Sequence, residues 1–415
     1  MKHRFRKALL AAAMGIGVTA AAGAVAQEIK IGVLATLEGP FAVPGQDSMR
    51  GAELALSEVN YTIAGKKVNL IKGSSNANPD VAVNAARKLV EQDKVDILIG
   101  PLSGSEGLAV KDYAKTQPNT TFLNGSSAAQ DTTLRDPAPN FFRFSTDGAQ
   151  WMAGLGDYVY KTKGYKKVAV VAEDYSFPYT QVLGFMLPFC TAGGKVPEKF
   201  WVPLGTKDYS SVIAKLPQDV DAIYVALGGA DAVNFLTQYQ QAGGSKPLIG
   251  GSITTDQTVL AAKGRTREAL IGTPAAGPIA DSWDNAKWQA FVAAYKKKFP
   301  DGLPSPSLFA HAYYVETKAA IAALEQVKGD LSGGQAKLRK ALASLKLDTP
   351  TGPVSLDENR NAVADIFLTE VAVGPGGGLY NKVVKVIPQV NQSLNMDKQK
   401  FLALGPVSRT NPECK

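Results

Sequence analysis

The chain has 415 residues, 45% of them hydrophobic, and a formal net charge of +8. This composition is typical of a globular protein with a packed core rather than of a disordered one. The densest basic run after the N-terminus is the three lysines at 296–298, so the sequence argues against nucleic-acid binding. No later segment approaches the ~18 consecutive apolar residues of a spanning helix, which argues against direct membrane insertion.

Residues 1–26 have the pattern of a secretory signal peptide. Four basic residues within 1–7 precede an apolar run rich in Ala and Gly, and Ala24-Val25-Ala26 offers a cleavage site before Gln27. The alternative is a retained membrane anchor, but the small residues and the cleavage site favour removal. No cysteine lies near the site, so a lipid anchor has no support. We expect an exported mature chain of 389 residues with a net charge of +4, long enough for two lobes.

The chain has two cysteines, Cys190 and Cys414. An exported protein folds where disulfides are permitted, and a lone exposed thiol is a liability there. The sequence therefore favours a bridge that ties the C-terminal tail to a helix ending near Ala192. Two unconnected thiols are the alternative.

Strands and helices alternate along the mature chain. Apolar runs predict strands at 29–35, 68–72, 97–99, 121–123 and 141–144, then at 168–172, 200–204, 222–227 and 247–249. Helical segments separate most of them, including one from about 47 to 60 and one opened by Asn78-Pro79-Asp80. This alternation indicates an α/β fold with doubly wound parallel sheets.

Two lobes joined by several crossovers account for this order. Crossovers are expected near 146–150 and after 275–278, with helices at 283–299, 307–327 and 334–345 returning to the first lobe. Strands at 354–356, 365–373 and 383–387 join the second. The predicted division is a signal peptide at 1–26, lobe 1 at 27–147 plus 278–350, lobe 2 at 148–277 plus 351–405, and a tail at 406–415.

The stretch DILIGPLSGSEGLAV at 96–110 is the leading candidate for a binding site. A buried strand ends at Gly100-Pro101, and a helix begins through Ser103-Gly104-Ser105. The first amides of a helix have no carbonyl partner, so with the small hydroxyls they suit an anion such as a carboxylate. An ordinary turn with a serine cap explains the same residues.

Four segments in order resemble one family across essentially the whole mature chain. They are IKIGVLATLEGPFAVPGQDSMRGAELALSEVN, ILIGPLSGSEGLAV, VAVVAEDYSFPYTQV and TGPVSLDENRNAVADIFL. The sequence resembles the periplasmic solute-binding proteins of branched-chain amino acid-type ABC importers, the leucine-binding-protein-like family. The resemblance implies a type I periplasmic binding fold, a monomer without a cofactor, and delivery of a small carboxylate ligand to an inner-membrane permease.

The resemblance also implies which residues touch the ligand. In this family, turns matching Ser103-Gly104-Ser105 and Ser126-Ser127-Ala128 grip the carboxylate. Phe177 matches an aromatic residue that stacks on the ligand, with a core role as the alternative, and Phe41 lies in a cleft-facing loop. Closure is expected to add residues of the second lobe, namely Gly228, Ser252 and Thr254.

Two departures from the family pattern narrow the expected ligand. Amino-acid binders of the family place an acid for the ligand's ammonium after the strand that matches 247–249. Here residues 250–254 contain no carboxylate, and the next one is Asp256; a hydroxyl common at the second turn is replaced by Ala128. A buried ammonium without a partner costs several kcal/mol, so the sequence favours an aromatic acid such as a hydroxybenzoate or phenylpropenoid. Branched-chain or other aliphatic amino acids or amides are the alternative, followed by a sensory module.

An enzyme is disfavoured. The mature chain has one histidine, His311, which falls in a predicted helix and is interpreted as structural. The motifs G-x-S-x-G, G-x-x-x-x-G-K-[ST] and H-E-x-x-H are absent from the sequence. Glu173 and Asp174 resemble a glycosidase pair only superficially, because neighbours on a strand point to opposite faces.

Overall fold

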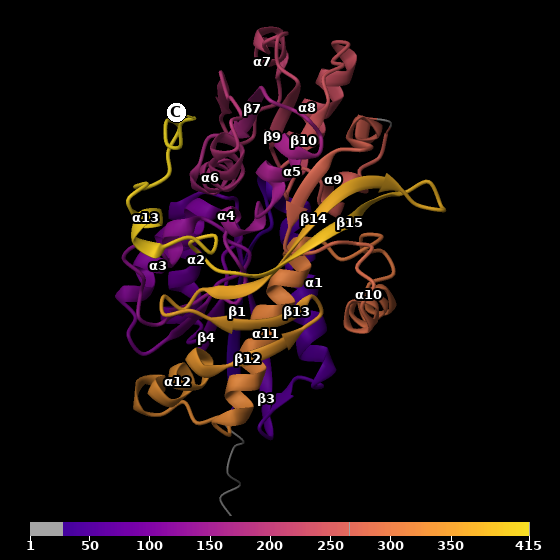
Figure 1. Ribbon diagram of the computed structural model, residues 1–415. Coiled ribbons are helices and arrows are strands. Elements are labelled where there is room, and N and C mark those ends of the chain that lie inside the picture. Colours follow the sequence, from indigo (N-terminus) through magenta and orange to yellow (C-terminus); the bar gives the residue numbers. More distant parts are fainter. Residues whose placement is uncertain (1–27, 265, 415) are drawn as a thin grey trace, which may run out of the picture.

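The computed structural model describes residues 28–264 and 266–414. The predicted signal peptide at 1–26 lies outside the described residues. Two β-sheets, each flanked by helices, make up the α/β architecture expected from the sequence (Figure 1). No helix of the described part is long and apolar enough to cross a membrane.

The first sheet has six strands in the order β2-β3-β1-β4-β5-β6. Its strands are parallel apart from the β2–β3 pair. They are β1 (Ile29–Thr36), β2 (Thr62–Ile63), β3 (Lys66–Ser75), β4 (Ile97–Ile99), β5 (Thr121–Leu123) and β6 (Phe141–Phe142). The main helices between them are α1 (Ala42–Glu58), α2 (Pro79–Arg87) and α3 (Gly104–Lys115). Every residue of β4 and β5 is buried, as expected of short apolar strands in the middle of a parallel sheet.

The second sheet has nine strands, and its centre is parallel. The parallel part contains β7 (Val168–Glu173), β8 (Lys199–Val202), β9 (Ala222–Ala226), β10 (Leu248–Gly250) and β11 (Pro274–Gly277). An antiparallel part adds β14 (Ala362–Val373), β13 (Gly352–Leu356), β12 (Lys346–Thr349) and β15 (Leu379–Val390). Its helices are α4 (Gly148–Trp151), α5 (Leu155–Lys161), α6 (Ser176–Thr191), α7 (Ser210–Lys215), α8 (Gly229–Gln241) and α9 (Gln257–Leu260).

The chain passes between the two halves of the molecule more than once. After β11 it forms α10 (Ala286–Lys298), α11 (Leu308–Gln326) and α12 (Ala336–Ser344), and α11 packs against α1 of the first half. The strands β12 and β13 lie beside α11, and β14 runs from there into the other half (Figure 1). The lobe boundaries stated above stay a prediction.

Several elements differ from the sequence prediction, among them α1, β2, β11 and β12. Helix α1 begins at Ala42 rather than near 47, because Pro44 falls in its first turn, where a missing N–H is harmless. The short strands β11 and β12 were not predicted. In β12 two of the four residues are exposed, so it lacks the apolar run by which the other strands were found.

A buried polar network ties the segment after β6 to the segment before β14. Arg143 Nε donates to Asn361 Oδ1 at 2.6 Å, and Asn361 Nδ2 donates to Gln150 Oε1 at 2.9 Å. Asp147 accepts from Gln392 Nε2 at 3.0 Å and lies 3.7 Å from the Arg143 guanidinium. Because these side chains come from segments that connect the two sheets, the connection is polar and hydrogen-bonded at its centre, although Gln392 Oε1 has no partner among the described residues.

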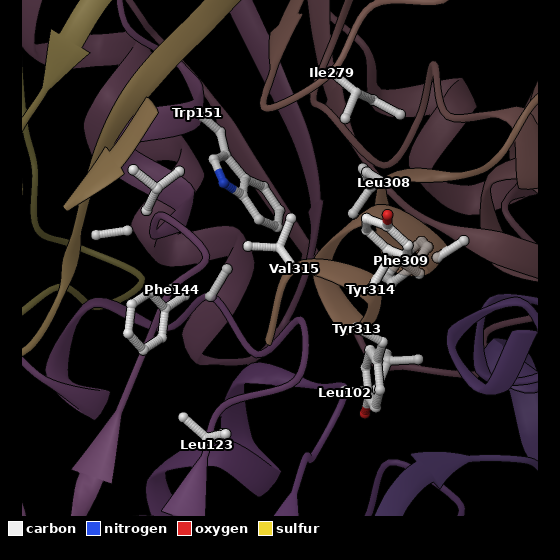
Figure 2. Packing of buried hydrophobic residues seen from close by; sticks show 14 of the residues in the cluster. Leu102, Leu123, Phe144, Trp151, Ile279, Leu308, Phe309, Tyr313, Tyr314 and Val315 are labelled. Carbon is white, nitrogen blue, oxygen red and sulfur yellow. The ribbon is translucent and has the colours of Figure 1, made fainter. Parts of the chain in front are cut away.

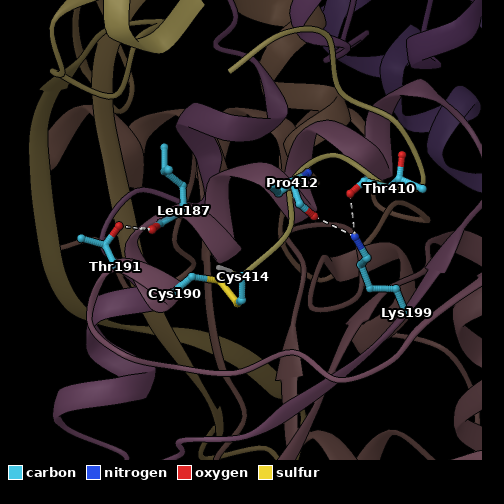
Figure 3. The surroundings of a disulfide bond; sticks show 7 residues. All are labelled: Leu187, Cys190, Thr191, Lys199, Thr410, Pro412 and Cys414. Carbon is cyan, nitrogen blue, oxygen red and sulfur yellow. Dashed lines mark hydrogen bonds between the residues drawn. A yellow bond between two sulfur atoms is a disulfide. The ribbon is translucent and has the colours of Figure 1, made fainter. Parts of the chain in front are cut away.

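The tail closes back on the second sheet. Cys190, near the end of α6, forms a disulfide with Cys414, which confirms the predicted bridge (Figure 3). Lys199 Nζ donates to the carbonyl oxygens of Thr410 and Pro412 at 3.2 and 2.7 Å. Earlier in the tail, Phe401 of α13 (Lys398–Leu402) packs in a small apolar cluster together with Leu134 and Leu183.

Candidate functional site

A small cavity lies between the loops that follow the strands of the two sheets. Parallel strands present their carboxyl ends at one edge, so the loops that follow β1, β4 and β5 meet the loops that follow β7 and β10. Six of the predicted site residues line this cavity: Phe41, Ser103, Gly104, Ser126, Ala128 and Phe177. The other lining residues are Leu102, Trp151, Tyr175, Ile253 and Phe309.

Ser103 starts α3 through a reciprocal cap with Glu106. Its hydroxyl oxygen accepts from the Glu106 amide at 3.4 Å, and Glu106 Oε2 accepts from the Ser103 amide at 3.0 Å. The Glu106 carboxylate is fully buried and also accepts from Thr36 Oγ1 and from the Ala77 amide, each at 3.0 Å. The turn is therefore a capped helix start and a cavity wall at once, so the two interpretations of the sequence are compatible.

The second predicted turn supplies one cavity-lining hydroxyl. Ser126 lines the cavity, with its Oγ 3.4 Å from the Leu102 carbonyl oxygen. The Ser127 hydroxyl is buried toward α3, without a hydrogen-bond partner among the described residues. A methyl group placed on Gly107 would lie 1.7 Å from that hydroxyl oxygen, so α3 can pack here only with glycine at this position.

The wall contributed by the second sheet is aromatic. The ring of Tyr175 lies 6.4 Å from that of Phe41 and 6.2 Å from that of Phe177, and Trp151 meets Phe177 edge-on at 5.5 Å. The Trp151 indole is oriented by a 2.8 Å hydrogen bond to Thr146 Oγ1. Figure 2 shows Trp151, Val315 and Phe309 among the packed residues of the main apolar cluster. These rings form a surface suited to a flat apolar group.

Some predicted site residues do not line the cavity. Ser105 Oγ lies 3.2 Å from Ser176 Oγ, at the start of α6 in the other half, and so joins the two walls. Ser252 accepts from Gln181 Nε2 at 2.6 Å. The Thr254 hydroxyl lies 2.7 and 2.8 Å from the carbonyl oxygens of Val225 and Leu227. The loop after β10 thus turns Ile253 toward the cavity, whereas the neighbouring hydroxyls form hydrogen bonds inside their own half.

The walls are in contact around the cavity. The space left at its centre is about 10 Å³, room for roughly one water molecule. A methyl group placed on Gly104 would lie 2.7 Å from the Phe177 Cβ. Ligand entry therefore requires the two halves to separate, as in hinged binding proteins.

Three buried titratable groups lie near or behind these walls. Burial raises the pKa of Asp256, the N-cap of α9, to about 7, although its carboxylate accepts from the Thr258 and Leu308 amides. Burial raises the pKa of Glu173 well above its ordinary value. Burial lowers the pKa of His311 to about 3, and its Nε2 lies 3.2 Å from Thr351 Oγ1 in the interior, in keeping with the structural interpretation.

Sequence reasoning missed part of the site. Trp151, Ile253 and Phe309 line the cavity from segments that showed no distinctive local pattern. Tyr175 lies two residues before Phe177 in the segment VAVVAEDYSFPYTQV, and its aromatic neighbours were the available signal. Glu173 was considered only as a possible glycosidase acid and set aside together with Asp174, because neighbours on a strand point to opposite faces. Within residues 28–264 and 266–414, no three His, Cys, Asp or Glu side chains gather as metal ligands.

Comparisons with known proteins agree with this geometry. A family model described as "Periplasmic binding protein" matches residues 28–377. The chain is 26% identical over 397 residues to Leu/Ile/Val-binding protein homolog 6 of Brucella melitensis, covering 91% of this chain and 96% of the relative.

Two solved structures are similar over nearly their whole length. An ABC transporter substrate-binding protein from Sphaerobacter thermophilus has a TM-score of 0.79 at 29% identity, covering 88% of this chain and 99% of that one. A solute binding protein of an ABC transporter from Rhodopseudomonas palustris BisB5, in complex with 3,4-dihydroxy benzoic acid, has a TM-score of 0.81 at 27% identity. The match covers 88% of this chain and 98% of that one.

Two α/β halves with a cavity between their strand ends define a hinged solute-binding protein of the type I periplasmic binding fold. This fold class was predicted from the sequence and is confirmed. The chain belongs to the periplasmic binding protein family, because the family model matches most of its length. This family is one of substrate-binding proteins.

Proposed function

We propose that this protein is the periplasmic solute-binding component of an ABC importer and captures a small aromatic carboxylic acid by closing its two lobes. The observation that carries the proposal is the pairing of opposite chemistries in one cavity. Ser103, Gly104 and Ser126 border it on one side, and Tyr175, Phe177 and Trp151 border it on the other.

The carboxylate is held by the first lobe. The Gly104 and Ser105 amides occupy the first turn of α3, where helix geometry gives an amide no carbonyl partner. The positive end of the helix dipole adds to these donors. The Ser103 hydroxyl accepts from Glu106, which leaves its own proton available to an anion. A carboxylate that receives two or three such bonds remains ionised in a closed cavity.

The ring is held mainly by the second lobe as the protein closes, with Phe41 contributed by the first lobe. Phe41, Tyr175, Phe177 and Trp151 offer edges and faces at separations usual for aromatic pairs. A ligand that touches both walls binds the closed form more tightly and shifts the population toward it. Ser105 and Ser176 meet across the gap in this structure, and because a ring needs more than the space of about 10 Å³ left at the centre, the walls lie further apart in the bound form.

The loop after β10 supports an acid that has no ammonium. Residues 250–254 contain no carboxylate, and Asp256 is occupied by backbone donors, including Leu308 at 2.8 Å. The similar protein of Rhodopseudomonas palustris, solved with 3,4-dihydroxy benzoic acid, supports the same ligand class.

The second candidate is an aliphatic amino acid. The Brucella melitensis relative is named as a Leu/Ile/Val-binding protein, and the buried carboxyl of Glu173 lies behind the cavity wall. We regard this candidate as weaker because burial raises the pKa of Glu173, which favours the neutral carboxyl over the carboxylate that an ammonium requires.

The proposal also includes export, lobe movement and delivery of the ligand to a permease. The signal peptide is removed near Ala26, and lobes 27–147 plus 278–350 and 148–277 plus 351–405 open and close as a monomer that delivers its ligand to an inner-membrane permease. Ser127, Gly228, Ser252 and Thr254 then support the loops that carry the contacts.

A panel of ligands tests the proposed function. Benzoate, hydroxybenzoates, phenylpropenoates, leucine, isoleucine and aliphatic amides are added to purified mature protein, and the thermal unfolding midpoint is measured. A ligand at 100 times its dissociation constant stabilises the folded state by about 2.7 kcal/mol, which is easily detected. Stabilisation by aromatic acids is expected. Stabilisation by leucine alone would transfer the function to the second candidate.

A further inference from the structure

Glu173 is a buried acid with half of its hydrogen-bonding capacity unused. It is the last residue of β7, and its side chain is completely buried. Oε1 accepts from the Gly228 amide at 2.9 Å. Oε2 has no hydrogen-bond partner among the residues described by the structure. Burying a polar atom without a partner lowers the stability of the folded state, so such an atom calls for an explanation, and a ligand that supplies the missing hydrogen bond is one.

Glu173 lies directly behind the cavity wall of the second lobe. A methyl group placed on Gly228, whose amide contacts Glu173, would lie 2.7 Å from Ile253 Cδ1 and 3.1 Å from Phe41 Cε1. Ile253 and Phe41 both line the cavity. Tyr175, another lining residue, directs its hydroxyl to the Glu173 carboxyl closely enough to affect its titration. The carboxyl therefore lies on the second-lobe side, directly behind the wall that faces Ser103 and Ser126.

The groups around Glu173 favour its neutral form. The Gly228 amide and the Tyr175 hydroxyl lower the pKa of Glu173 because they stabilise the carboxylate. Burial outweighs them and raises this pKa, and the negative charge of the nearby Asp231 also raises it. A neutral carboxyl is a poor partner for a cation. It is a good hydrogen-bond partner for a neutral hydroxyl, because it both donates and accepts.

We propose that Glu173 and Tyr175 together recognise a hydroxyl group on the ligand's ring, at the end remote from its carboxylate. The inference rests on the proposed function and narrows it, since the preferred ligand becomes a hydroxylated aromatic acid rather than benzoate. The ring hydroxyl accepts a hydrogen bond from the protonated Glu173 Oε2, because Oε1 already accepts from the Gly228 amide, and it donates to the Tyr175 hydroxyl oxygen. The hydrogen-bonding capacity left at Glu173 Oε2 is then used inside the closed protein.

Calorimetric titration with matched acids tests the assignment. The probes are benzoate, 4-hydroxybenzoate, 3-hydroxybenzoate, 3,4-dihydroxybenzoate and 4-methylbenzoate, which fills space without offering a hydrogen bond. The wild-type protein is expected to bind at least one hydroxylated acid about tenfold or more tightly than benzoate or 4-methylbenzoate. That ratio corresponds to one hydrogen bond to a buried group that is otherwise left unpaired.

Two variants locate the source of the preference. Glu173→Leu is expected to bring the hydroxylated acids within about threefold of benzoate while benzoate itself still binds. Tyr175→Phe retains the ring and folds even if Glu173→Leu does not, and it is expected to reduce the preference severalfold. Asp221→Asn is the matched control: its carboxylate accepts from the Lys166 amide at 2.7 Å, it does not line the cavity, and the ratio should not change.

The outcomes separate the two levels of the proposal. If no aromatic acid binds, the proposed function fails and this inference fails with it. If benzoate and the hydroxylated acids bind equally, or if the preference survives in both variants, the inference is wrong and the proposed function stands. Tight binding of leucine that is lost in Glu173→Gln would instead assign Glu173 to an ammonium.

Discussion

The two walls of the cavity differ in how they are made and supported. The first-lobe wall consists of backbone and small hydroxyls around Ser103, and it is held by one buried acid, Glu106, both of whose carboxylate oxygens have partners. The second-lobe wall consists of rings, and the acid behind it, Glu173, has a partner on one oxygen only. The acid behind the first wall has all its partners without a ligand, whereas the acid behind the second has hydrogen-bonding capacity left over.

This difference assigns separate tasks to the two lobes. A polar wall that is already organised binds a carboxylate without rearranging, which keeps the cost of ordering low. The rings of the second wall contribute hydrophobic binding free energy only when the two halves come together and bury them, so their contribution depends on closure. We expect the first wall to determine that an anion binds and the second to determine which one.

The largest expected effect concerns an acid that supports the second lobe. Folding raises the pKa of Asp256 from its ordinary value near 3.8 to about 7 by burial. Between these values the folded state binds a proton that the unfolded state has lost, so stability falls as pH rises from about 4 to 7. The slope is at most about 1.4 kcal/mol per pH unit.

Chemical denaturation at several pH values measures this dependence. Asp256→Asn cannot titrate and should show a flatter profile than the wild type over pH 4–7. Equal slopes in the two proteins would show that Asp256 does not bind a proton in this range.

The next effect breaks the first wall. In Gly107→Ala the added methyl would meet the buried Ser127 hydroxyl at 1.7 Å, so α3 or the 126–128 turn must shift. Overpacking of this kind costs about 1–3 kcal/mol. We expect a lower unfolding free energy together with weaker binding of every carboxylate.

Gly376→Ala provides the matched control for Gly107→Ala, because nothing lies within 4 Å of the added methyl in the loop between β14 and β15. The pair Gly107→Ala with Ser127→Gly should recover part of the lost stability. If Gly107→Ala is as stable as the control, the close packing of α3 on Ser127 is wrong.

A third substitution obstructs the contact between the two walls without changing the structure of either wall. In Gly104→Ala the methyl would lie 2.7 Å from the Phe177 Cβ only when the halves are closed together. Alanine is a better helix residue than glycine, so the ligand-free protein should be as stable as the wild type or slightly more so. Affinity should fall about tenfold or more, which calorimetry measures. Unchanged affinity would mean that the walls of the ligand-bound form are far enough apart at Gly104 to accommodate the added methyl.

The smallest effect tests the rings. Phe177→Leu keeps an apolar side chain but loses the edge-to-face contact with Trp151 and the contact with Tyr175. Aromatic pairs contribute about 0.5–1.5 kcal/mol beyond burial, so aromatic acids should bind roughly twofold to tenfold more weakly. Aliphatic acids in the same titration serve as the reference. An equal loss for both classes would assign Phe177 a purely steric role.

Much of the scaffold could be predicted from local sequence. The strands β4 and β5 have the predicted bounds, and Asn78 caps α2 as expected, accepting from Asp80 N at 2.8 Å. Apolar runs and capping residues act over a few positions, so their signals are readable without the fold. The Ser103 turn was found for the same reason.

The side chains that face the cavity were harder to predict. Ser252, Ile253 and Thr254 are consecutive, yet only Ile253 lines the cavity, because the hydroxyl of Thr254 bonds to the carbonyls of Val225 and Leu227. Those partners belong to the end of β9 and the residue after it, and no short-range pattern contains them.

The sequence by itself determined the alternation of strands and helices, the donor-rich start of α3 and the two cysteines available for a bridge. These depend on periodicity, turn chemistry and composition, which are local properties of the chain. Only the tertiary structure decided that Trp151, Ile253 and Phe309 share a cavity with Ser103, and that Glu173 has an unpaired oxygen behind it. Such relations arise where segments distant in sequence pack together, because packing decides which polar groups find partners.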